Sequence, residues 1–195
     1  MRPFLFRLLA LLVLLAPAAC AQSPERPAPK ATASALPARL DTTRVKWHPS
    51  VSAAMAAAEV SGKKVLVDIY APWCPWCRRL QREVYPDDRV LTLLQAYFEP
   101  VRVNGDLVDD TLRFKGYTLS SSMFARALGA QAYPTIAFLD PAGRKITHLP
   151  GFTQVPEFAR VLRYVGTDAY RAQTYEQFTA ADTVQAVRPP ARREQ

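Results

Sequence analysis

The residues with the clearest chemical potential are the two cysteines of the segment Cys74-Pro75-Trp76-Cys77. An apolar run at 65–70 precedes this segment and a helix-compatible stretch at 78–84 follows it, which predicts a strand-to-helix junction. Because a helix N-terminus favours negative charge, a thiol on its first turn ionises more readily. The spacing therefore predicts a redox pair, in which a more exposed Cys74 attacks a disulfide and a more buried Cys77 resolves the mixed disulfide.

Two other readings of this cysteine pair need to be weighed, a static structural disulfide and half of a zinc site. A structural zinc site needs about four ligands. The chain has three cysteines and two histidines, His48 and His148, and the third cysteine is Cys20, far away in sequence. These counts disfavour a metal, so we expect no cofactor other than the cysteine pair itself, and the static disulfide stays as the alternative.

Asp68 is the one charged residue within the apolar run at 65–70. A carboxylate buried in a strand without a partner is costly, so its pKa should be raised toward neutrality. The alternative is an edge-strand aspartate that faces water.

The N-terminal twenty residues have the pattern of an export signal. Arg2 and Arg7 precede an apolar run at 8–15 and the small residues at 16–19. The apolar run is too short for a stable membrane span. Cys20 follows directly and resembles the lipidated cysteine of bacterial lipoproteins, although Pro17 stands where a leucine is usual; cleavage after Ala21 is the alternative. We therefore expect a periplasmic or other extracytoplasmic protein, with membrane contact only through a lipid anchor.

Composition and length indicate one globular domain. The chain has 195 residues, 49% of them hydrophobic, and a net charge of +8. It has no block of Lys and Arg interleaved with aromatic residues, which argues against a nucleic-acid partner. The sequence divides into a signal peptide at 1–20, a Pro- and Ala-rich linker at 21–45, a domain at 46–180 and a flexible tail at 181–195.

Strand and helix patterns alternate along the domain, which predicts an α/β fold with an antiparallel hairpin at its C-terminal edge. The expected strands lie at 65–70, 98–103, 135–139 and 144–149, and a short hairpin lies at 111–119. The expected helices lie at 53–60, from the cysteine pair to 84, and at 89–96, 121–128, 155–165 and 170–180.

The chain resembles the thioredoxin-like thiol–disulfide oxidoreductases. The resemblance is carried by the segments 67–77 and Tyr133-Pro134-Thr135, and it covers about residues 47–180. Residues 83–87 resemble the thioredoxin-like domain of the transmembrane disulfide reductase DsbD, and the segment after 162 resembles periplasmic thioredoxins associated with sulfur oxidation. The family implies a three-layer fold, with a central mixed sheet flanked by helices.

The resemblance also implies roles for individual residues. Asp68 would accept and return the proton of the second cysteine, and Pro134 would follow a cis bond beside the cysteine pair, where it is otherwise only a loop proline. The backbone of Tyr133 would pair with the target as an added strand. The residues expected to contact the target, with core packing as the alternative for Tyr133, are Trp73, Pro75, Trp76, Tyr133 and Pro134.

The direction of electron flow is harder to predict. No histidine lies between the cysteines to stabilise a thiolate, which argues against a strong oxidant and favours a reductase. A reductase would act on disulfide-containing exported proteins and would need a membrane electron donor resembling DsbD. A disulfide oxidase or isomerase is the alternative within this chemistry, and a binding or chaperone module with a static disulfide is the alternative outside it. We expect a monomer.

Overall fold

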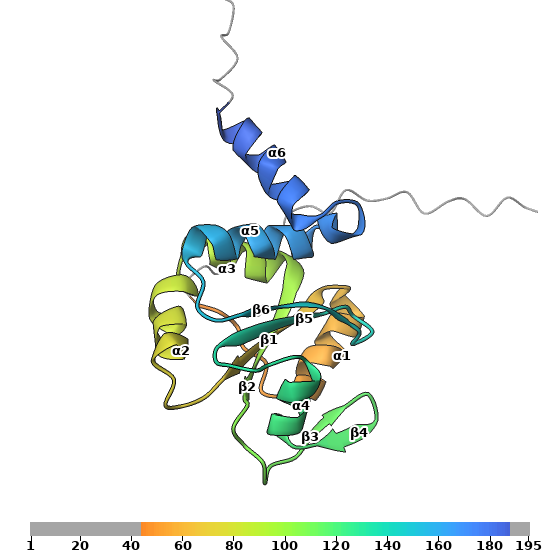
Figure 1. Ribbon diagram of the computed structural model, residues 1–195. Coiled ribbons are helices and arrows are strands. Elements are labelled where there is room, and N and C mark those ends of the chain that lie inside the picture. Colours follow the sequence, from red (N-terminus) through yellow and green to blue (C-terminus); the bar gives the residue numbers. More distant parts are fainter. Residues whose placement is uncertain (1–43, 188–195) are drawn as a thin grey trace, which may run out of the picture. The chain divides into compact units, whose positions relative to one another are not determined.

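The computed structural model describes residues 44–187, and a four-stranded mixed sheet lies at its centre (Figure 1). The strand order is β2 (Phe98–Asn104), β1 (Lys64–Tyr70), β5 (Thr135–Leu139) and β6 (Lys145–Pro150). Strand β1 is parallel to β2 and antiparallel to β5, and β5 is antiparallel to β6. The predicted signal peptide, Cys20 and most of the predicted linker lie outside the described residues, as does the chain after 187.

Helices cover both faces of this sheet, and the central strand β1 is therefore buried on both sides. Val65, Val67 and Ile69 pack with α1 (Val51–Ser61) and α4 (Ser121–Ala127). Leu66 packs on the opposite face, against a cluster that includes residues of α3 (Asp88–Tyr97) and α5 (Val155–Gly166). Since side chains alternate along a strand, Asp68 shares the face of Leu66.

Three helices begin within two residues of the predicted positions, each at a side-chain cap. Ser50 accepts a hydrogen bond from the Ala53 amide at the start of α1, and Ser120 accepts one from the Met123 amide at the start of α4. Asp87 caps α3 by accepting from the amide of Arg89. These contacts satisfy amides that the first turn of a helix leaves unpaired.

The helix after the cysteine pair differs from the prediction of a regular helix to 84. Helix α2 (Pro75–Arg79) passes into a π-helical turn, Leu80–Val84, and the Tyr85 amide donates to the Leu80 carbonyl. The wider turn is compatible with burial of Leu80, Val84 and Tyr85 on one side of the helix.

The remaining elements lie outside the central sheet. The predicted hairpin is confirmed as β3 (Leu112–Phe114) and β4 (Tyr117–Leu119). After α5, a 3-10 turn at Ala169–Arg171 leads into α6, Tyr175–Val187, where Tyr175 and Phe178 pack on Tyr164 of α5. Helix α6 continues seven residues beyond 180, where we predicted that the domain ends. No helix between residues 44 and 187 is long and apolar enough to cross a bilayer.

Candidate redox site

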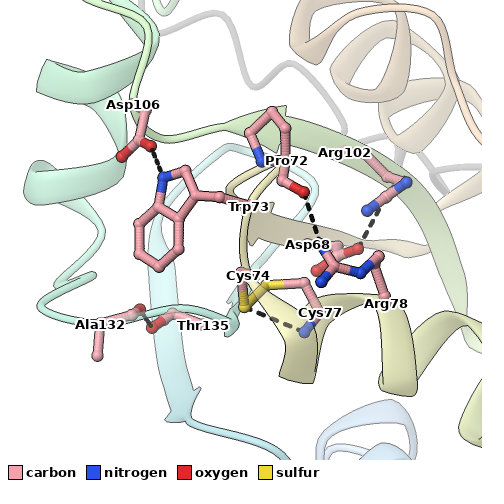
Figure 2. Close-up of a disulfide and its surroundings, with 10 residues drawn as sticks. All are labelled: Asp68, Pro72, Trp73, Cys74, Cys77, Arg78, Arg102, Asp106, Ala132 and Thr135. Atoms are coloured by element: carbon pink, nitrogen blue, oxygen red, sulfur yellow. Dashed lines mark hydrogen bonds and ion pairs between the residues drawn. A yellow bond between two sulfur atoms is a disulfide. The ribbon is translucent and has the colours of Figure 1, made fainter.

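The two cysteines form a disulfide at the start of α2 (Figure 2). Cys74 is the N-cap residue, and its sulfur accepts a hydrogen bond of 3.1 Å from the Cys77 amide. Pro75 occupies the first turn, where its missing N–H removes no helical hydrogen bond. An amide at a helix N-terminus therefore points at the Cys74 sulfur, an arrangement that favours a thiolate there.

The expected difference in exposure between the two thiols is wrong. Cys74 and Cys77 are each 2% exposed, and they form a small cluster with Ala71, against which Tyr70 and Tyr133 pack. The two cysteines are therefore equally buried as residues. A target sulfur that reacts with Cys74 must therefore displace part of this packing.

Trp73 directly precedes Cys74 in sequence. It is 65% exposed, and its indole N–H donates to an Asp106 carboxylate oxygen at 2.5 Å. The Trp73 ring meets the Tyr133 ring edge-on at 5.8 Å. Burial, and then the hydrogen bond with Asp106, raises the pKa of Tyr133 to about 12. Asp106 therefore links two residues that we predicted to contact the target; it was not among the predicted site residues, because it lies about thirty residues from the cysteines in sequence.

Trp76 lies between the two cysteines in sequence. It is 50% exposed and lies 5.5 Å from the ring of Phe152. The guanidinium of Arg79 stacks over both rings, at 5.7 Å from Trp76 and 4.8 Å from Phe152, and its Nε donates to Glu83. These contacts restrict the position of the indole. Sequence analysis missed Phe152, which follows β6 and reaches the site only through the fold.

The bond between Tyr133 and Pro134 is cis, as the family resemblance implied. Pro134 is buried and Tyr133 is half-buried. Tyr133 therefore packs against the core and also leaves part of its surface open to a target. The Pro134 carbonyl accepts from the Gly151 amide at 2.8 Å, which connects this loop to the one that carries Phe152. Thr135 closes the loop by donating its hydroxyl to the Ala132 carbonyl (Figure 2).

Gly105 provides the space for Tyr133. A Cβ at this position would lie 2.7 Å from both Cε1 and the hydroxyl oxygen of Tyr133, and 3.0 Å from Ile69. We expect Gly105→Ala to lower the free energy of unfolding by about 1–3 kcal/mol, because the Tyr133 ring must move. Urea unfolding measures this loss. In a Tyr133→Ala background the loss should fall by more than half, and an undiminished loss would show that Tyr133 is not its cause.

Asp68 is 1% exposed and lies in the central strand, so the alternative of an edge-strand aspartate facing water is wrong. We had expected a carboxylate without a partner, but this one is paired. Arg102 on β2 donates its Nε to Asp68 at 2.8 Å (Figure 2). Burial nevertheless outweighs the charge of Arg102 and raises the pKa of Asp68. The predicted direction of the pKa shift therefore holds, although the environment differs.

Arg102 is itself held by aromatic rings. Its guanidinium carbon lies 4.0 Å from the centre of the Tyr70 ring and 5.7 Å from that of Trp47. Parallel pairing of β1 with β2 places Asp68 directly opposite Arg102. Only this register identifies Arg102 as a partner, since the two residues are 34 positions apart.

The described residues contain no group of three or more His, Cys, Asp or Glu side chains that could hold a metal ion. Residues 51–166 match the family model described as a thioredoxin-like domain. The chain belongs to the thioredoxin-like family. In this family's oxidoreductases the cysteine pair is itself the redox centre, and no separate cofactor is needed.

Relatives of this thioredoxin-like chain include the thiol:disulfide interchange protein DsbD of Pseudoalteromonas atlantica, which is 33% identical over 107 residues, 54% of this chain and 16% of the relative. DsbD of Ralstonia nicotianae is 35% identical over 98 residues, 46% of this chain and 15% of the relative. The chain thus spans about one sixth of the length of these curated relatives. The predicted resemblance to DsbD is confirmed, whereas the resemblance to sulfur-oxidation thioredoxins stays a prediction.

Among solved structures, a thioredoxin from Thermus thermophilus superimposes with a TM-score of 0.50 and 27% sequence identity. The match covers 63% of this chain and 87% of that thioredoxin. The predicted three-layer thioredoxin-like fold, with a central mixed sheet, is therefore confirmed.

Proposed function

We propose that this protein is a thiol:disulfide oxidoreductase that exchanges disulfides through Cys74 and Cys77. The observation that carries the proposal is the disulfide at the N-terminus of α2, with the Cys77 amide donating to the Cys74 sulfur. Membership of the thioredoxin-like family and similarity to proteins named thiol:disulfide interchange protein support it.

In the reducing direction, the Cys74 thiolate attacks one sulfur of a target disulfide. The target disulfide breaks, its other sulfur leaves as a thiolate, and Cys74 becomes joined to the target in a mixed disulfide. The Cys77 thiol then passes its proton to the Asp68 carboxylate and attacks the Cys74 sulfur. This step forms the Cys74–Cys77 disulfide and releases the second target thiolate, so the target gains two electrons and the enzyme loses two.

The side chains around the disulfide suit the binding of an extended target segment. Trp73 and Trp76 are largely exposed, whereas the cysteines next to them in sequence are buried. Pro75 is exposed next to them, and the Tyr133-Pro134 bond presents its backbone beside Trp73. In this proposal the Tyr133 backbone pairs with the target as an added strand, and the two indoles cover the exchanging sulfurs.

We propose that the protein works outside the cytosol as a reductase of exported disulfide proteins. The export-signal pattern at 1–20 and the lack of a histidine between the cysteines support this direction and place. The electron donor would be a membrane protein resembling DsbD, and a lipid on Cys20 would hold the domain at the membrane.

The equilibrium reduction potential of the Cys74–Cys77 pair tests the direction. We expect a value near ~−270 mV, as in thioredoxin, from titration in dithiothreitol or glutathione buffers. A value of ~−120 to −180 mV would instead indicate a disulfide oxidase or isomerase. A pair that does not equilibrate with either buffer would support the static disulfide of a binding module.

A further inference from the structure

A pocket of about 290 Å³ lies on the side of Arg102 and Tyr85. Its walls come from the segment 44–47 before α1, from the π-helical turn and the two residues after it, and from β2. The lining residues are Arg44, Val45, Trp47, Gln81, Tyr85, Pro86 and Arg102. The pocket has room for several water molecules, and Arg44 at its rim is exposed to solvent.

Two buried polar atoms, one on Asp68 and one on Tyr85, lie close to each other. Neither the hydroxyl of Tyr85, a residue only 3% exposed, nor Oδ1 of Asp68 completes a hydrogen bond with any described residue. The two groups are close enough to influence each other: the Tyr85 hydroxyl lowers the pKa of Asp68, and the Asp68 charge adds to burial in raising that of Tyr85. Buried polar atoms of this kind are normally satisfied by water.

The charged and titratable groups around Asp68 come from three elements. Arg102 on β2 holds Oδ2, Tyr85 at the end of the π-helical turn faces the carboxylate, and Cys77 lies on α2. Strand β5, on the other side of β1, places the apolar Ile136 opposite Asp68. Across the pocket, Arg44 adds one more positive charge. Tyr85 carries the one hydroxyl among these groups: it lies close enough to Asp68 to lower the pKa of that carboxyl, and Tyr85 also lines the pocket.

The buried Asp68 carboxyl needs a route for protons to water, because in each turnover it must lose the proton that it has accepted. The front of the site offers little access, since both cysteines and Asp68 are at most 2% exposed and a bound target would cover them further. We infer that Tyr85 relays protons between Asp68 and water in the pocket bounded by Trp47 and Arg102. The redox site then exchanges its proton through this pocket and not past the cysteines.

The relay balances without any further reactant. After Cys77 has transferred its proton to Asp68, the Asp68 carboxylic acid donates this proton to the Tyr85 oxygen while the Tyr85 O–H donates its own proton to a pocket water. Asp68 returns to the carboxylate, Tyr85 stays neutral, and one proton reaches solvent. Tyr85 acts only through Asp68, so it is a positioning and relay residue. This inference rests on the proposed acid–base role of Asp68.

Tyr85→Phe in the full chain tests the relay, because it removes only the hydroxyl and keeps the ring that packs on Trp47 and Phe158. With insulin as the disulfide probe and dithiothreitol as the electron source, we expect the multiple-turnover rate of insulin reduction near neutral pH to fall about tenfold. The ratio of the rates in H₂O and D₂O should increase. The free energy of unfolding should stay unchanged or rise, because an unsatisfied buried hydroxyl is lost.

Tyr164→Phe is the matched control, since its hydroxyl donates to the Gln173 carbonyl and not into this pocket. Wild-type rates and an unchanged isotope ratio in Tyr85→Phe would overturn the relay. So would a rate loss that comes with lower stability, or an equal rate loss in Tyr164→Phe.

The outcome for Asp68 separates this inference from the proposed function. If Asp68→Asn slows resolution and Tyr85→Phe does not, only the relay fails. If Asp68→Asn has no effect, the acid–base role fails and the relay fails with it. Since both residues act in series, the double variant should be no slower than Asp68→Asn alone, and an additive loss would contradict a shared route.

Discussion

Cys74→Ser should reduce the rate of insulin disulfide reduction on the order of 10³-fold or more, to the uncatalysed rate. A serine hydroxyl is not ionised near neutral pH and cannot form a mixed disulfide, whereas the helix N-terminus favours the thiolate of Cys74. The turbidity of precipitating insulin chains, with dithiothreitol as the electron source, measures the rate. A Cys74→Ser variant that keeps more than a tenth of the activity would contradict the proposed nucleophile.

Cys77→Ser should have a different outcome, because Cys74 can still attack but nothing resolves the product. We expect a covalent adduct between this variant and its target, visible on a non-reducing gel and lost on reduction. Cys20→Ser is the control for the third cysteine: catalysis by the purified protein should not change, although membrane association should be lost if Cys20 carries a lipid. No adduct with Cys77→Ser would leave only a static disulfide.

Asp68→Asn should slow the resolution of the mixed disulfide about 10²-fold at pH 7 and above. Only the ionised carboxylate can accept the Cys77 proton, and burial raises the pKa of Asp68. The wild-type rate should therefore fall as the pH decreases through this raised pKa. The variant has no such group, so its rate should not show this decrease, which we call the pH step. The difference in rate between the two proteins should therefore shrink at low pH.

Asp106→Asn is the matched control, since it removes a second carboxylate near the disulfide, one that is exposed and bound to the Trp73 indole. It should keep the pH step. Stopped-flow rates between about pH 5 and 9 make the comparison, chosen to span the ordinary pKa values of carboxyl and thiol groups. The acid–base role of Asp68 is refuted if its variant keeps the step or if Asp106→Asn loses it.

The same raised pKa affects stability with a defined sign. A carboxyl group with a higher pKa in the folded state than in the unfolded state contributes stability that is complete below its unfolded pKa. This contribution is lost as the pH rises through the folded pKa of Asp68. Wild-type protein should therefore lose stability relative to Asp68→Asn as the pH rises, which urea unfolding at several pH values would measure.

The sequence was sufficient for the order of elements. Local signals determine most helix and strand positions: Ser50, Asp87 and Ser120 cap helices that begin within two residues of the predicted positions, and the apolar run at 65–70 became the buried strand β1. Such signals depend on hydrogen bonds within a few residues and on the period of the apolar pattern, so the sequence displays them directly. The departure of the helix into a π-helical turn at Leu80–Val84 left no comparable local signal.

By itself, the sequence determined the chemistry: two cysteines of suitable spacing at a strand-to-helix junction, and an acidic residue in the strand before them. The tertiary structure alone decided what surrounds them. It paired Asp68 with Arg102 through the register of β1 and β2, joined Trp73 to Asp106, placed Phe152 and Arg79 against Trp76, and buried the Tyr85 hydroxyl close to Asp68. Most of these contacts join residues far apart in the chain, and they depend on strand register and on the packing of helices against the sheet. Burial and partners also set the pKa of each group, so only the folded chain determines how readily the cysteine pair exchanges its proton.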